Sequence, residues 1–258
     1  MSESNIRNSQ YIIMSEHFYT SIAKYYQHLF PANPKQVKFL STILPYNGAK
    51  ILDVGCATGD LSFALTKFGF PIWAFDFDAE MIEIAQNAKS EETMFPIFEQ
   101  LDMRLLDQHY PEAFFDTVIC FGNTLVHLQN DDDIKQFLLA SHKVLSKDGT
   151  LTIQILNYRY IIENKINSLP PIENDFIHFD RSYEFTEGSS LIDFNTKLTI
   201  KSTGEVIQNS VKLYAVTQAK LQQLLDEIGF NKLEFFGSFM SEALKSDSLP
   251  LIVTCKKK

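Results

Sequence analysis

Short apolar runs alternate with helix-like segments through the middle of the chain, and this alternation constrains the fold most. Runs of strand length fall at residues 50–54, 71–75, 95–100, 115–120 and 149–156. Between them, apolar residues at three- and four-residue steps predict helices at 61–68, 79–89 and 131–145. Strands joined in this way by helices predict a Rossmann-like α/β fold, in which helices cover both faces of a mostly parallel sheet.

The pattern is interrupted near residue 172 and resumes near residue 217. Strand-like runs at 176–185, 190–200 and 206–215 are separated by two short turns, each containing a glycine. A helix at 217–228 and strands at 232–239 and 249–255 then complete a seven-stranded sheet with an antiparallel edge. We therefore predict one domain over residues 1–258, with 172–216 inserted as a three-stranded antiparallel lid.

Composition excludes several classes of protein. Of the 258 residues 45% are hydrophobic and 21% charged, which is ordinary for a packed globular core. A net charge of −9 argues against a nucleic-acid partner, because phosphate binding needs concentrated Lys and Arg. Three cysteines without metal-ligand spacing predict no metal site and a cytoplasmic protein, and no apolar stretch is long enough to cross a membrane. A homodimer remains open.

A glycine-containing turn follows the first predicted strand, in the sequence DVGCATGD. Gly55 and Gly59 allow a tight turn and close approach of a ligand to the backbone, and the next helix points its amides at that ligand. A dinucleotide-binding turn would need glycine at positions 57 and 60, where this chain has Ala57 and Asp60. Because an acidic residue repels a pyrophosphate, the sequence argues against a dinucleotide.

A carboxylate ends the second predicted strand. Asp76 stands 21 positions beyond Gly55, and its two oxygens could accept hydrogen bonds from both hydroxyls of a ribose. The alternative is that Asp76 caps the next helix. Asp78 fits that capping role better, since it directly precedes the helix that starts at residue 79.

These residues carry a resemblance to a known family. ILDVGCATGD resembles the first motif of class I S-adenosylmethionine-dependent methyltransferases, and the segment HFYTSIAKYYQHLF, a predicted helix over 16–30, resembles the helix that closes over their cofactor. The resemblance implies that Asp53 faces the amino group of the cofactor's methionine part, and that Asp102 and Met103 meet its adenine. The cofactor-binding residues that it implies are Tyr19, Asp53, Gly55, Cys56, Ala57, Gly59, Asp76, Phe77, Asp102, Met103 and Gly122.

A more local resemblance concerns the methyl acceptor. FGNTLVHL, at 121–128, resembles a segment of glycine and sarcosine N-methyltransferases, and implies that His127 orients the substrate or removes its proton. Packing beneath the cofactor is the alternative for His127. Those enzymes have an arginine before the asparagine that follows the fifth strand, where this chain has Leu156. The candidates for substrate contact are Asn123, His127, Asn157, Arg159 and Arg181.

The sequence thus predicts an enzyme that uses S-adenosylmethionine to methylate nitrogen or oxygen of a small molecule. Two alternatives stand beside it. An RNA or protein methyltransferase would need a basic rim, which the net charge does not indicate. A non-catalytic cofactor-binding domain would keep the same cofactor residues, so these residues do not distinguish it from an enzyme.

Overall fold

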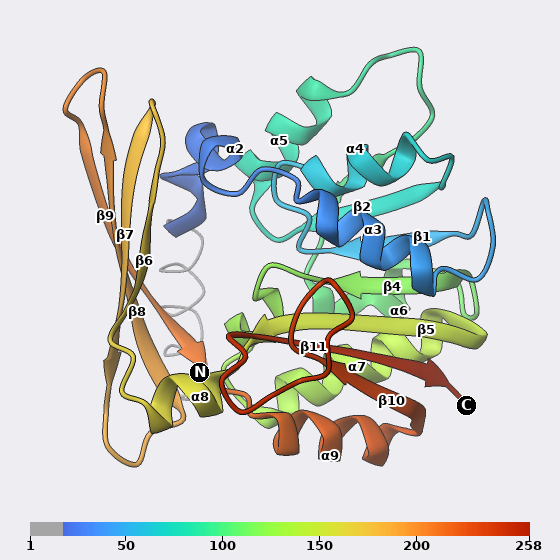
Figure 1. Cartoon of the computed structure of the whole chain (residues 1–258). Helices are drawn as coiled ribbons and strands as arrows, with labels where there is room; N and C mark the ends of the chain where they lie inside the picture. The colour runs from blue at the N-terminus through green and yellow to red at the C-terminus, as the bar shows by residue number, and fades with distance from the viewer. Residues whose placement is uncertain (1–17) are drawn as a thin grey trace, which may run out of the picture.

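The computed structural model describes residues 18–258 and contains two β-sheets (Figure 1). The main sheet has seven strands with helices packed against it. The second sheet has four strands and stands to one side of the main sheet (Figure 1). The prediction of a Rossmann-like, seven-stranded α/β fold is confirmed.

The main sheet has the strand order β10-β11-β5-β4-β1-β2-β3. Its strands are β1 (Ile51–Val54), β2 (Ile72–Asp76), β3 (Ile97–Gln100), β4 (Phe115–Cys120), β5 (Leu145–Leu156), β10 (Phe230–Phe236) and β11 (Pro250–Lys257). β11 alone runs opposite to the other six strands, and the terminal pair forms the antiparallel edge that the sequence predicted, with β11 inside and β10 outermost. The reason is burial: residues 251–255 are buried without a break, whereas β10 alternates between buried or half-buried and exposed positions, as an edge strand does.

Helices cover both faces of the main sheet. One face packs against α3 (Pro34–Ile43), α4 (Asp60–Thr66) and α5 (Ala79–Ala88), and the other against α6 (Leu106–His109), α7 (Asp131–Val144) and α9 (Gln218–Ile228). Neighbouring residues of β1 divide between these two cores, Ile51 to the first and Leu52 to the second. This is the alternation that a strand buried on both faces requires.

The second sheet has one strand more than predicted. Its strands are β6 (Ser168–Glu173), β7 (Ile177–Phe185), β8 (Leu191–Ile200) and β9 (Val206–Tyr214), antiparallel and in chain order. The missed strand, β6, contains Pro170 and Pro171. Proline lacks an N–H group for the ladder and is confined to edge strands, and β6 is an edge strand. The inserted strands therefore begin at residue 168, not 172.

The N-terminal segment, defined here as residues 18–30, joins the two sheets. The helix predicted there is broken: residues 18–20 are helical, and η1 (Ala23–Tyr25) and α2 (Tyr26–Leu29) follow. Asn209 Nδ2 on β9 donates to Ser21 Oγ at 2.7 Å, while Thr20 Oγ1 donates to Asp78 Oδ2 at 2.7 Å beside α5. In Figure 1 this segment lies between the second sheet and the helices of the main sheet.

Candidate active site

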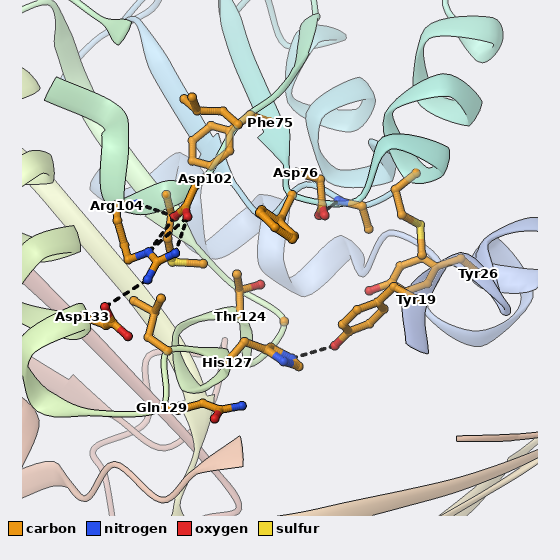
Figure 2. Close-up of a pocket in the computed structure, with 18 of the residues that line it drawn as sticks. Tyr19, Tyr26, Phe75, Asp76, Asp102, Arg104, Thr124, His127, Gln129 and Asp133 are labelled. Atoms are coloured by element: carbon orange, nitrogen blue, oxygen red, sulfur yellow. Dashed lines mark hydrogen bonds and ion pairs between the residues drawn. The ribbon is translucent and has the colours of Figure 1, made fainter. Parts of the chain in front are cut away.

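A pocket opens at the carboxyl ends of β1, β2, β3 and β4, beneath the N-terminal segment (Figure 2). This is the end of an open α/β sheet at which ligands bind. Many residues singled out from the sequence line it. They are Tyr19, Gly55, Ala57, Asp76, Phe77, Asp102, Met103, Gly122 and His127.

The turn after β1 needs glycine for two different contacts. Gly55 has φ +71°, and a Cβ atom there would lie 2.6 Å from the hydroxyl of Thr124, in η3 (Thr124–His127). Gly59 has φ +82°, and its Cβ would lie 2.5 Å from the ring of Phe98 on β3. Gly55 therefore shapes the pocket wall. Gly59 does not line the pocket and instead allows the turn to pack against β3.

Asp53 and Cys56 face the protein interior. Ser62 Oγ on α4 donates to Asp53 Oδ2 at 2.6 Å, and burial raises the pKa of Asp53 to about 6. The Cys56 thiol is buried too and donates to the carbonyl of Ala57 at 3.6 Å. Neither residue lines the pocket, which differs from their expected place against the cofactor. Asp53 instead ties β1 to α4.

Asp76 presents its carboxylate to the pocket. It accepts the backbone N–H groups of Ala57 at 2.9 Å and Asp78 at 3.0 Å, one on each oxygen. Burial raises the pKa of Asp76 to about 6, although these N–H groups favour the charged form. A carboxylate has about four acceptor positions, so one remains on each oxygen. Two adjacent free acceptors fit the two ribose hydroxyls of S-adenosylmethionine.

The cap of α5 explains why Asp76 is free for this role. Asp78 Oδ1 accepts the N–H groups of Glu80 at 2.9 Å and Met81 at 3.1 Å. Asp78 is thus the helix cap that the sequence predicted. Asp76, two residues earlier, is left facing the pocket.

A group of charged residues lies on the opposite side of the pocket from Tyr19 (Figure 2). Asp102 is paired with Arg104, whose Nη2 is 2.6 Å from Asp102 Oδ2, and Arg104 Nη1 is 3.1 Å from Asp133 Oδ1. Sequence analysis missed Arg104 and Asp133. Arg104 stands two residues after a predicted contact, but its partner on α7 is 29 positions further along and becomes a neighbour only in the fold.

His127 and Tyr19 are in contact on the side of the pocket away from Arg104. Tyr19 Oη lies 2.8 Å from His127 Nε2, and the two rings are packed edge to face. Burial lowers the pKa of His127 to about 4 and raises that of Tyr19, so at neutral pH both side chains are uncharged. The two residues are 108 positions apart in the chain and meet because the N-terminal segment crosses over η3.

The two asparagines expected at the substrate form structural hydrogen bonds instead. Asn123 Nδ2 donates to Tyr158 Oη at 2.8 Å, and Asn123 Oδ1 accepts the N–H of Leu156 at 3.0 Å. Asn157 caps α8 (Tyr158–Glu163) and donates to the carbonyl of Ser248 at 3.0 Å. Neither lines the pocket, because both ends of each amide are engaged in connecting β4, β5 and α8.

The two arginines expected at the substrate also lie outside the pocket. Arg159 is exposed and paired with Glu163 at 2.9 Å on the surface of α8. Arg181 is on β7 and donates to the carbonyl of Pro170 on β6 at 2.7 Å. Arg104 is the one Lys or Arg among the described residues that line the pocket. A free cation for a substrate carboxylate is therefore not found among them.

Within 18–258 there is no group of three or more His, Cys, Asp or Glu side chains placed to hold a metal ion. In the same part of the chain, no helix combines the length and apolar character needed to span a membrane.

Comparisons with known proteins agree with this fold and pocket. Residues 51–149 match the model of a family described as a methyltransferase domain. A glycine/sarcosine N-methyltransferase of Aphanothece halophytica is 25% identical over 220 residues, which is 85% of this chain and 80% of that protein.

Solved structures show the same fold. An S-adenosylmethionine-dependent methyltransferase from Clostridium acetobutylicum has a TM-score of 0.77 at 18% identity, covering 92% of this chain and 98% of that one. An amino pentose methyltransferase from Micromonospora echinaspora, solved with S-adenosylmethionine bound, has a TM-score of 0.62 at 12% identity, covering 91% and 95%.

The family match covers the segment that forms the pocket floor, from β1 to the start of β5. Within it, Gly55 and Asp76 provide the turn and the paired acceptors that an adenosyl cofactor needs. Residues 51–149 therefore form a methyltransferase domain, and the chain as a whole is similar to class I S-adenosylmethionine-dependent methyltransferases.

Proposed function

We propose that this methyltransferase acts on an uncharged amine nitrogen of a small molecule that binds beside Tyr19 and His127. The observation that carries the proposal is the partly buried hydrogen bond between these two side chains, at 2.8 Å, on the side of the pocket away from Asp102. Tyr19 and His127 are the acceptor-side residues in this proposal, and Asp76 and Asp102 the cofactor-side residues.

The cofactor leaves little chemistry for the protein to perform. When bound, S-adenosylmethionine supplies a methyl group already activated by its positively charged sulfur. The chain therefore needs to hold the acceptor in line and exclude water, and orientation of this kind can contribute about 7–11 kcal/mol in favourable cases. A catalytic dyad is not required.

The state of His127 favours nitrogen over oxygen. A group with a pKa of about 4 is a poor base at neutral pH, because general bases work best when their pKa is near the working pH. A hydroxyl acceptor must lose its proton as it attacks. A neutral amine attacks through its lone pair and releases a proton to water afterwards, so His127 need only help to orient the amine.

The surroundings of the pocket favour a small acceptor. The N-terminal segment covers one side and is bonded to the second sheet through Ser21 and Asn209. Among the described residues that line the pocket, Arg104 is the one cationic side chain and is engaged by two carboxylates, so a nucleic acid or a carboxylate finds no free partner among them. An amine without a neighbouring carboxylate, such as an amino sugar, therefore fits better than glycine.

The proposal is tested by a methyl-transfer screen that follows release of S-adenosylhomocysteine. Acceptors are offered in matched pairs: amino sugars against the same sugars with a hydroxyl, and simple amines against glycine and sarcosine. We expect turnover with amines that lack a carboxylate, and the exposed-site control Arg159→Met should match the wild type. Turnover confined to hydroxyl compounds, amino acids or RNA would contradict the proposal, and cofactor binding without any turnover would favour a non-catalytic domain.

A further inference from the structure

Four polar side chains form a continuous chain of hydrogen bonds at the end of the pocket away from Tyr19. Arg104 binds Asp102 on one side and Asp133 on the other (Figure 2), and Asn130 Nδ2 donates to Asp133 Oδ2 at 2.9 Å. Asn130 also caps α7 by accepting the N–H of Asp133 at 2.8 Å. All four residues line the pocket. The network therefore runs from the start of α7, at Asn130 and Asp133, to the carboxylate of Asp102.

The hydrogen bonds to Asp102 can be counted. Its Oδ1 accepts the backbone N–H of Arg104 at 2.9 Å and the Nε–H at 3.1 Å, and its Oδ2 accepts Nη2–H at 2.6 Å. The single Nε–H is also shared with Oδ2, at 3.1 Å. Oδ1 thus has two donors, whereas Oδ2 has one full hydrogen bond and a share of the Nε–H, so the remaining acceptor capacity of the carboxylate is on Oδ2.

Apolar side chains line the pocket beside this polar network. Leu101 and Met103 flank Asp102 in the chain, Leu128 precedes the loop to α7, and all three line the pocket. An apolar slot with one hydrogen-bond acceptor at its edge suits a flat heterocycle that carries one N–H donor. In the cofactor of this family, that description fits the adenine ring with its 6-amino group.

We propose that Arg104 is a positioning residue that makes the pocket selective for the 6-amino group of the cofactor's adenine. It fixes the Asp102 carboxylate so that one acceptor on Oδ2 is presented, and Asp133 fixes Arg104 from the opposite side. A purine with a 6-oxo group would place an oxygen against this acceptor, and both would lack a partner. This inference concerns the cofactor alone and does not depend on which methyl acceptor is used.

The electrostatics of the network support a fixed pair. The hydrogen bonds with Asp102 and Asp133 raise the pKa of Arg104 above its usual value, so the guanidinium stays charged at any working pH. An arginine that binds a carboxylate through two nitrogens restrains its orientation more than a lysine can, because the guanidinium is planar and rigid.

The test is direct binding of two ligands that differ at one group, S-adenosylhomocysteine and S-inosylhomocysteine, measured by calorimetry. We expect the wild type to prefer the adenosyl compound by tenfold or more. Arg104→Met should reduce that preference to below threefold, chiefly by weakening the adenosyl compound. Arg104→Lys and Asp133→Asn should give intermediate preferences, and the control Arg159→Met should leave the preference unchanged.

Three results would overturn the inference. They are a wild type without preference, a preference that Arg104→Met leaves intact, and an equal loss of both ligands in Arg104→Met, which would indicate a general packing role. If Arg104→Met does not fold, as judged by its melting curve, Arg104→Lys and Asp133→Asn decide the question through the same ratio of affinities for the adenosyl and inosyl compounds. No acceptor substrate enters the experiment, so its outcome is separate from that of the amine proposal.

Discussion

The two ends of the pocket are built from different kinds of chain segment. At the cofactor end, Gly55, Asp76 and Asp102 each follow a parallel strand of the main sheet within one or two residues, or end it. At the acceptor end, Tyr19 and His127 come from segments 108 positions apart, and the second sheet holds one of those segments in place. The cofactor end therefore depends on local chain order, and the acceptor end on how distant parts of the chain pack.

Burial also acts in opposite directions at the two ends. It raises the pKa of Asp76 to about 6 and lowers that of His127 to about 4, because in both cases the charged form loses hydration. At neutral pH the cofactor end thus presents a negative charge and the acceptor end an uncharged imidazole. Substitutions at one end should leave the function of the other largely intact.

The largest effect is expected where the two ends meet. Gly55→Ala places a methyl group against Thr124 of η3, at a positive φ, and should weaken S-adenosylmethionine binding about a hundredfold. Gly69→Ala is the matched control, since Gly69 has φ +84° with nothing within 4 Å of the added Cβ. Calorimetry with both variants separates the contact from the backbone strain. Equal losses in the two would show that the Thr124 contact is unimportant.

Asp76→Ala should weaken the cofactor roughly thirtyfold while sparing the acceptor end. A thirtyfold loss corresponds to about 2 kcal/mol, which is within the roughly 1.5–3 kcal/mol that one hydrogen bond to a charged group contributes; water that replaces the carboxylate offsets the loss of the second. With the cofactor at saturating concentration, turnover should recover to within a few-fold of the wild type. Steady-state kinetics checks this, and a lasting loss of kcat would mean that Asp76 also acts on the acceptor.

His127→Gln should have the reverse pattern. We expect kcat to fall about tenfold, because the amine loses a side chain that orients it. Cofactor affinity should change less than threefold. Tyr19→Phe is a milder companion, since it removes only the hydroxyl that is bonded to His127. A large fall in cofactor affinity in His127→Gln would instead support the reading that His127 packs beneath the cofactor.

The smallest effect is a pH dependence of cofactor binding. The charged form of Asp76 accepts the ribose hydroxyls, and with a pKa of about 6 it becomes protonated as the pH falls. Affinity should therefore drop about fourfold between pH 7.5 and pH 5.5, if the protonated form binds weakly. The dependence should disappear in Asp76→Asn and persist in Asp53→Asn, since Asp53 has a similar pKa but bonds to Ser62. His127 should not contribute, because its pKa lies below this range.

The same contrast decides how far sequence alone could predict this molecule. The alternating pattern predicts the main sheet and its helices, and the turn at Gly55 and the carboxylate of Asp76 are found at the pocket because each is placed by its own strand. Asp53 shows the limit of such motifs. It lies on β1 as the sequence predicts, but its side chain is bonded to Ser62 on α4. Which face a side chain takes depends on packing that a motif does not describe.

Features that depend on contacts between distant parts of the chain were mostly not predicted from the sequence. The proline-containing strand β6 lacks strand propensity and forms because β7 offers it an edge. The pairing of Arg104 with Asp133 needs α7 to lie beside η2 (Met103–Leu105). Arg159 and Arg181 were chosen as candidate cations, and residue type does not show where a side chain points.

The most direct test of the division between the two ends is a crystal structure of the protein with S-adenosylhomocysteine bound. We expect ribose hydroxyls within hydrogen-bonding distance of Asp76, the purine between Leu101 and Leu128, and the thioether sulfur beside Tyr19 and His127. A purine stacked at Tyr19, or a ligand bound away from Asp76, would contradict it.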